Sequence, residues 1–115
     1  MLQLIKEYDY NHYAKLVQKL GTLIENKENH EERMIYDFLV FAQRMVEVKL
    51  DTLNHSGEYL IWCLSDDAQD IVLFAKSISE NRSSNNDSIN DLIQQCANEL
   101  MYLISIKCAR FYTED

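Results

Sequence analysis

Histidines with acidic neighbours are the first candidates for chemistry in this chain of 115 residues. His30 and the two glutamates after it begin like the helix of a zinc protease, which needs a second histidine one turn later. Met34 occupies that place, so the pair of imidazole ligands is missing. Asp9 and His12 are the nearest approach to the acidic-x-x-His pattern of di-iron bundles, but the pattern must occur on two helices. The sequence therefore predicts no metal site and no cofactor.

Other patterns typical of enzymes are also missing. The chain has two glycines, too few for the glycine-rich loops that bind phosphates and dinucleotides. Helical ribonucleases of the HEPN class place a histidine at a short fixed spacing after an arginine, and none of the four arginines has one there. No serine or cysteine lies in a turn motif typical of a nucleophile. We therefore expect a protein that is not an enzyme.

Carboxylates dominate the second half of the chain. Residues 1–50 hold eight acidic and seven basic residues, whereas residues 51–115 hold eleven acidic and four basic ones, within a formal net charge of −8. No lysine or arginine lies between Leu50 and Ala75. Such a field repels nucleic acid and anionic lipid, and it speeds the encounter with a basic partner. We expect a basic protein partner, no direct binding of nucleic acid and no membrane binding.

The candidate partner-binding residues combine these acids with two aromatic side chains. On a helix, Asp70 shares a face with the two aspartates before it. Two aromatic residues precede the acids at i and i+3, and aromatic side chains beside carboxylates are typical of interface anchors. A core position for Trp62 stays open as the alternative. The predicted set is Glu58, Tyr59, Trp62, Asp66, Asp67, Asp70, Asp87 and Asp91.

The elements that would position these residues are predicted to be helices. Without proline and with two glycines, the chain lacks both helix breakers and the usual hairpin turns. Apolar residues recur at steps of three and four in two long segments. The patterns predict a single all-α domain over residues 1–115, a compact bundle of four to five helices around a central helix (about residues 31–53) and a long C-terminal helix (about residues 88–111).

The central segment has more apolar residues than one stripe needs. Met34, Phe41 and Val48 fall beside the main stripe and widen it, which is typical of a helix surrounded by others. Before it, a first helix is predicted to be capped by Asp9 or Asn11 and to run to about residue 26. Glycine 21 lies inside its pattern and marks either a close contact between helices or a weak point.

Turns and caps divide the rest of the chain. Asn29 is the predicted cap of the central helix. Residues 58–64 fit a buried strand or a short helix, and we favour the helix because no second strand is evident. Ser65 or Asp66 is expected to cap a further helix to about residue 80, with Ile71, Val72, Phe74, Ala75 and Ile78 facing inward; residues 58–80 could instead form one kinked helix. Residues 81–86 are predicted to be a loop, followed by Asp87 or Ser88 as the last cap.

The cysteines and the N-terminal residues bear on the compartment. Cys63, Cys96 and Cys108 are odd in number, without C-x-x-C spacing, and lie among apolar residues. They are therefore expected to be buried thiols in a reducing compartment. Charged residues among the first ten disfavour a signal peptide, and no uncharged run approaches the ~20 apolar residues that cross a bilayer. We expect a cytoplasmic protein.

In its overall properties the chain resembles immunity proteins, which are small, acidic, helical and cytoplasmic and lack catalytic groups. The resemblance implies an inhibitor that neutralises a toxin nuclease by covering its basic active-site cleft. The alternative is a helical adaptor or regulatory subunit that acts as a homodimer through its broad apolar stripes. A monomer that captures a basic protein would favour the inhibitor, and a salt-insensitive dimer would favour the adaptor.

Overall fold

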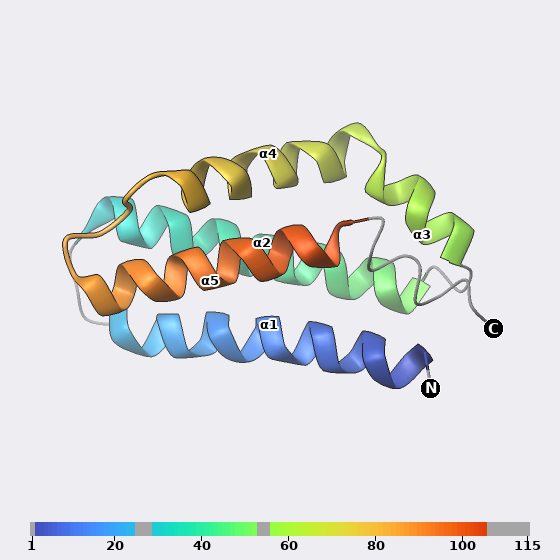
Figure 1. Ribbon diagram of the computed structural model, residues 1–115, viewed down its shortest axis with the longest axis horizontal. Helices are drawn as coiled ribbons and strands as arrows, with labels where there is room; N and C mark the ends of the chain where they lie inside the picture. Colours follow the sequence, from blue (N-terminus) through green and yellow to red (C-terminus); the bar gives the residue numbers. More distant parts are fainter. Residues whose placement is uncertain (1, 25–28, 53–55, 106–115) are drawn as a thin grey trace.

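The computed structural model of the protein describes residues 2–24, 29–52 and 56–105. Within these residues the chain is helical and contains no strand, so the predicted all-α class is confirmed. Both long helices of the prediction are present (Figure 1). The elements are α1 (Leu2–Ile24), α2 (His30–Thr52), α3 (Ser56–Cys63), α4 (Asp66–Glu80) and α5 (Asp87–Leu103).

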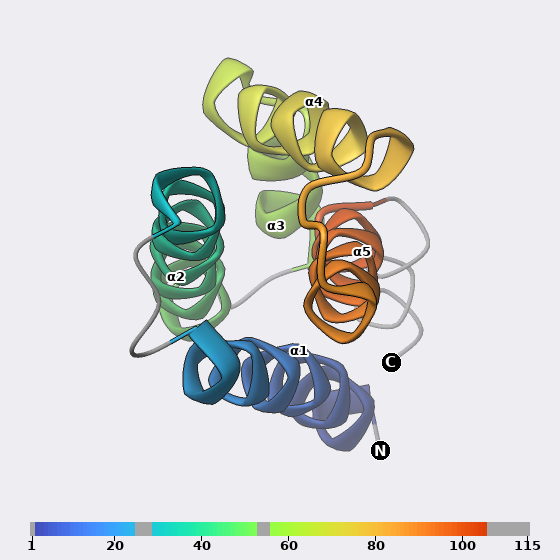
Figure 2. The same cartoon turned by 90° about the vertical axis from the view of Figure 1, so that its left-hand side faces the viewer.

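Helix α5 packs against three other helices. It contacts α1, α4 and α2, and α1 also packs against α2. Seen along the bundle, α2 and α5 face each other, with α1 on one side of them and α4 on the other (Figure 2). The apolar stripe of α5 is buried almost completely and forms the middle of the core: Ile89, Leu92, Ile93, Cys96, Ala97, Leu100 and Leu103.

Helix α1 begins earlier than predicted. Its first residue is Leu2 instead of Asp9 or Asn11. Residues 2–8 contain neither proline nor glycine, and extending a helix backwards from a formed turn is far easier than starting a new one. Tyr13, fully buried, donates a hydrogen bond of 2.6 Å from its hydroxyl to the carbonyl of Leu39. This bond ties α1 to the middle of α2.

Helix α5 ends at Leu103, whereas the apolar pattern predicted a helix to about residue 111. The carbonyl of Leu103 accepts a hydrogen bond from the hydroxyl of Tyr59 in α3. The hydroxyl of Ser105 donates to the carbonyl of Tyr102. Side chains thus bind two carbonyls that a longer helix would use for its own backbone. The remaining predicted residues, 106–111, lie outside the described part of the chain.

Of the four predicted helix caps, two are confirmed and two are wrong. Asp9 and Asn11 lie inside α1 and do not cap it. The side chain of Asn29 accepts from the backbone N–H of Glu32 at 3.1 Å, and Ser65 caps α4. The cap of α5 is Asn86 instead of Asp87 or Ser88, and it accepts from the N–H of Ile89 at 3.1 Å. The N–H of Asn86 is held by the Ser84 hydroxyl at 3.0 Å, which fixes the helix start one residue earlier.

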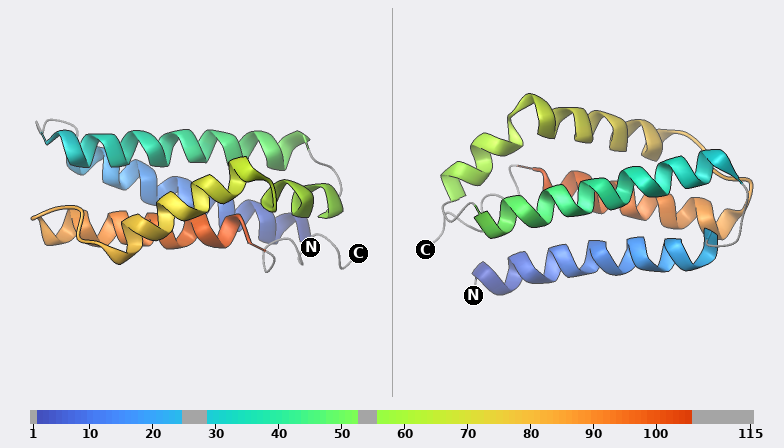
Figure 3. Two further views of the ribbon diagram at one scale, coloured as in Figure 1. Left: turned by 90° about the horizontal axis from the view of Figure 1, so that it is seen from above. Right: turned by 180° about the vertical axis from the view of Figure 1, so that it is seen from behind.

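Residues 58–63 are helical, as we favoured, and α3 and α4 are two helices instead of one kinked helix. The break lies at Leu64 and Ser65. The Ser65 hydroxyl donates to the carbonyl of Trp62 at 2.6 Å, and the Gln69 side chain donates to the carbonyl of Cys63 at 2.7 Å. These bonds replace the backbone pairs that a continuous helix would form. Figure 3 shows the change of direction between α3 and α4.

Candidate protein-binding surface

An open groove of about 390 Å³ lies between α2 and α4. The two helices occupy neighbouring sides of the bundle in Figure 2, and each packs on α5. We call this feature the α2–α4 groove. It is lined by three residues of α2 and four of α4, namely Phe38, Phe41, Met45, Asp67, Asp70, Ile71 and Phe74.

The apolar side of the groove comes from a second stripe on α2. The first stripe, which recurs at helical spacing, is buried and consists of Ile35, Leu39, Ala42, Val46 and Leu50. The second stripe alternates steps of four and three residues and consists of Met34, Phe38, Phe41, Met45 and Val48. Phe41 is 54 % exposed, and both ends of the stripe are also exposed. Helix α2 is therefore not surrounded by other helices, contrary to the prediction from its apolar width.

One aromatic contact spans the two helices. The ring centroids of Phe38 and Phe74 lie 4.3 Å apart, with an angle of 45° between the ring planes. Phe74 was predicted to face inward with Ile71 and Ala75, but it is 42 % exposed. It lies on the edge of the inward face, where α4 meets the side chains of α2 instead of the core. The contact gives the groove an aromatic floor that remains partly open to solvent.

Asp67 and Asp70 form an acidic rim on the α4 side of the groove. Both carboxylates are exposed, and neither forms a salt bridge with any described residue. Asp67 lies in the first turn of α4, where the helix dipole stabilises a negative charge. Asp70 lies one turn deeper and lacks that compensation. The groove therefore combines apolar surface with negative charge that the described residues do not neutralise.

Tyr59 and Trp62 do not reach this surface. Their exposed fractions are 1 % and 8 %, and their ring centroids lie 5.7 Å apart inside the core. The alternative of a core position for Trp62 is the one that the structure supports, and Tyr59 shares it. Both rings lie on the face of α3 that packs against the core, whereas Ile61 on another face of the helix is 72 % exposed. The exposed aromatic residues nearest the acids are instead Phe41 and Phe74.

The remaining predicted acids are divided between the two ends of the bundle. Glu58 and Asp66 are exposed near the junction of α3 and α4. Asp87 and Asp91 are exposed at the start of α5, which lies at the other end because α5 runs antiparallel to α4 (Figure 1). Asp87 forms a salt bridge with Arg82. The structure thus brings Asp67 and Asp70 together at the groove, and places Asp87 and Asp91 away from it.

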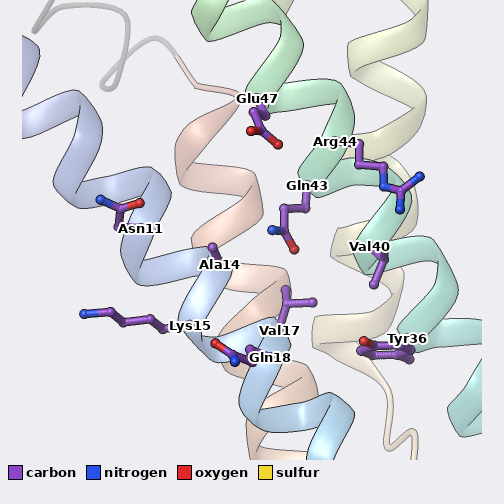
Figure 4. Close-up of a pocket in the computed structure, with 10 residues that line it drawn as sticks. All are labelled: Asn11, Ala14, Lys15, Val17, Gln18, Tyr36, Val40, Gln43, Arg44 and Glu47. Carbon is purple, nitrogen blue, oxygen red and sulfur yellow. The ribbon is translucent and has the colours of Figure 1, made fainter.

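A second cavity, of about 460 Å³, lies between α1 and α2. Its lining mixes polar and apolar side chains and includes Gln18, Gln43 and Glu47. Lys15 and Arg44 extend away from each other, one from each helix (Figure 4). Because these cations do not converge, the cavity lacks the paired positive charge that would hold an anion.

The thiol of Cys96 is a poor nucleophile. Cys63 and Cys96 are both buried and free of disulfides, and Cys108 lies outside the described residues. Burial, with a smaller contribution from the nearby Glu99 carboxylate, raises the pKa of Cys96 to about 12. Its thiol is therefore protonated at neutral pH, and the thiolate is the reactive form.

Three further observations limit how the site can be interpreted. Among the described residues, no group of three or more His, Cys, Asp or Glu side chains could hold a metal ion. No described helix is long and apolar enough to cross a membrane. Comparison with protein-family models, with curated proteins and with solved structures gave no match.

The sequence pattern predicted Asp67 and Asp70 but not the apolar side chains of the groove, and the two aromatic residues that it predicted are buried. A signal for the apolar side of the groove exists in the sequence. The second stripe of α2 keeps its own steps of four and three beside the buried stripe, and a regular second row is more than one core-facing helix needs. Its position at the groove could only follow from the arrangement of α2 and α4.

Proposed function

We propose that this protein is a non-catalytic inhibitor that binds a basic protein through the α2–α4 groove. The observation that carries the proposal is the coincidence of an apolar groove with two exposed carboxylates, Asp67 and Asp70, that have no salt bridge among the described residues. The partner class that fits best is a toxin nuclease. Its phosphate-binding cleft is basic, and a protein seated over it excludes the nucleic acid.

The two halves of the surface have different roles in this mechanism. The carboxylates attract the partner over several ångströms and raise the rate of association. Exposed aromatic side chains such as Phe41 and Phe74 supply the apolar contact that slows dissociation. No bond of the partner or of its substrate is broken by this chain.

The proposal is tested by capture and inhibition with charge-reversed variants. We expect the wild-type protein to capture a basic protein from its host and to abolish the nuclease activity of that protein at equimolar concentration. Asp67→Lys with Asp70→Lys should weaken binding by about a hundredfold or more, because attraction becomes repulsion inside the contact. Binding is measured by surface plasmon resonance at low and high salt, and circular dichroism checks the helix content.

The matched control is Glu80→Lys with Asp91→Lys. This variant makes the same change in net charge on exposed residues of α4 and α5, away from the groove. It should keep nearly full inhibition. An equal loss of inhibition in both variants would show that the effect depends on the overall charge and not on the groove. A captured partner with no activity that this protein suppresses would contradict the inhibitor proposal.

The alternative is a helical adaptor that forms a homodimer. The exposed second stripe of α2 favours it, because apolar rows of this spacing pair in helical dimers. Sedimentation at micromolar concentration separates the two functions. A dimer that persists at high salt supports the adaptor, and a monomer that binds a basic partner supports the inhibitor.

A further inference from the structure

We infer that the α2–α4 groove binds one amphipathic α-helix of its partner, with basic side chains along the edge that faces α4. The inference rests on the proposed function, since this helix belongs to the protein that is inhibited. It adds the kind of structural element that is recognised and the orientation of its charged edge.

The length and spacing of the second stripe fit a helix. Met34 and Val48 are fourteen residues apart on α2, which corresponds to about 21 Å, or four helical turns. Alternating steps of four and three let the side chains of one helix insert between those of another at a small crossing angle. An incoming helix of similar length would lie on the groove residues of α2 and α4 and extend toward the exposed ends of the stripe.

An extended peptide fits the groove less well. The walls of the groove are helices whose backbone N–H and C=O groups are already paired within each helix. The polar side chains that line it are the carboxylates of Asp67 and Asp70, which accept hydrogen bonds but do not donate them. A strand would bury carbonyl groups without donors, at a cost of about 1–3 kcal/mol for each. A helix satisfies its own backbone and avoids that cost.

The charges determine how the helix lies. The α2 side of the groove consists of Phe38, Phe41 and Met45, whereas both acids stand on the α4 side. Lysine or arginine residues on one edge of the incoming helix would reach these carboxylates while its apolar face lies on α2. Met45, with its flexible thioether side chain, can adapt to apolar residues of different shapes.

A second copy of this chain has the exposed second stripe of α2, but it fits the groove less well than a basic partner. Its net charge of −8 opposes self-association. Lys15 and Lys19 are on α1, but the apolar row of α1 is buried against α2 and α5. The occupant is therefore a helix from a different and basic protein.

The test uses synthetic peptides of about sixteen residues, long enough for the four turns. The first has leucine at alternating steps of four and three and lysine on one edge. The second carries glutamate in place of lysine, and the third is a scramble of the first. Fluorescence anisotropy should show the lysine peptide binding about tenfold or more tightly than the other two. Circular dichroism should show that it becomes helical on binding.

Two matched variants locate the peptide. Phe41→Asn replaces an exposed residue of the groove, and Leu73→Asn replaces an exposed residue of α4 that does not line it. We expect about a tenfold loss of affinity in the first and little change in the second. Asp67→Asn with Asp70→Asn should remove the preference for lysine over glutamate. The inference is overturned by equal loss in the two asparagine variants, by unchanged binding to Phe41→Asn, or by equal binding of the scrambled peptide.

Failure of this inference can be separated from failure of the proposed function. A captured nuclease could keep its affinity for Phe41→Asn but lose it for Asp67→Lys with Asp70→Lys. That result would support the inhibitor proposal and overturn the inference of a bound helix. If the lysine peptide binds in the groove but no nuclease is inhibited, the inference of a helix-binding site is supported and the proposed function is overturned. A wild-type dimer that Phe41→Asn dissociates would overturn the inference in favour of a second copy.

Discussion

Gly21 and Tyr36 show how one missing side chain sets the distance between two helices. A Cβ placed on Gly21 would lie 2.8 Å from the Tyr36 hydroxyl oxygen and 3.0 Å from two of its ring carbons. The tyrosine of α2 thus rests directly on the backbone of α1. Of the two interpretations left open by the sequence, the structure supports a close contact between helices.

We expect Gly21→Ala to raise the free energy of unfolding more in the Tyr36→Ala protein than in the wild type. The difference between the two effects should be about 0.5–1 kcal/mol. Alanine is favoured over glycine within a helix by roughly that amount. In the wild type the new methyl group must push the tyrosine ring aside, which consumes the gain. Urea unfolding of the four proteins measures the coupling free energy. Equal effects in both backgrounds would show that the ring moves at no cost.

Single residues divide clearly into those that the sequence could predict and those that it could not. Asn29 and Ser65 were predicted as caps because a cap depends on its own side chain and on the next three residues. Whether Phe74 and Trp62 point inward depends on which helix lies opposite, and that information is distributed over the whole chain. For this reason the sequence could name Asp67 and Asp70 as exposed acids but could not assign the aromatic side chains that lie beside them.

Among the elements, the loop between α4 and α5 is held by a buried carboxylate from α2. Glu32 is buried in the first turn of α2. The Ser84 hydroxyl donates to its Oε2, and the N–H of Ser83 donates to the side chain of Asn90 at 2.9 Å. These bonds fix the end of α4 relative to the start of α2. They therefore help to set the width of the α2–α4 groove.

Glu32→Ala should lower the free energy of unfolding by about 1–3 kcal/mol, because the buried Ser84 hydroxyl loses its acceptor. Glu31→Ala is the matched control. Glu31 lies in the same turn and contributes similarly to the helix dipole, but it is exposed. Chemical denaturation of both variants measures the difference. Similar losses of unfolding free energy in the two proteins would show that the effect comes from the helix dipole and not from the hydrogen bond between Glu32 and Ser84.

The elements themselves were largely predictable because apolar periodicity and caps are local signals. The ends of α1 and α5 were not. The start of α1 lacks a strong cap signal, and the end of α5 depends on the hydroxyl of Tyr59, forty-four residues away. Contacts at such a separation leave no periodic trace in a single sequence.

On the scale of the whole molecule, buried groups that lose protons make the fold sensitive to alkali. Burial raises the pKa of Cys96 from 9.0 to about 12, and burial likewise raises the pKa of Tyr13. Between those pH values the unfolded chain loses the thiol proton while the native chain retains it. Since the unfolded state then binds fewer protons, stability falls as the pH rises. Below pH 9.0 the thiol contributes its full stabilisation.

We expect the free energy of unfolding to decrease above about pH 9, with a slope from the thiol of at most ~1.4 kcal/mol per pH unit. Cys96→Ala should be less stable at neutral pH but should show a shallower decrease between pH 9 and 10. Leu100→Ala, in the same buried stripe, loses packing without losing a titrating group and should keep the wild-type slope. Urea titrations across this range compare the three proteins. Parallel curves would show that Cys96 does not couple to unfolding.

The separation of the second stripe of α2 from the buried stripe has a consequence for how such a protein can diverge. Phe41, Asp67 and Asp70 lie outside the core that joins α5 to its neighbours, so replacing them leaves that core filled. If the α2–α4 groove binds a partner as proposed, descendants of this chain can acquire new binding specificities through a few surface changes while they inherit the same scaffold. Natural variants that pair with different targets should differ first at these three positions and last along α5.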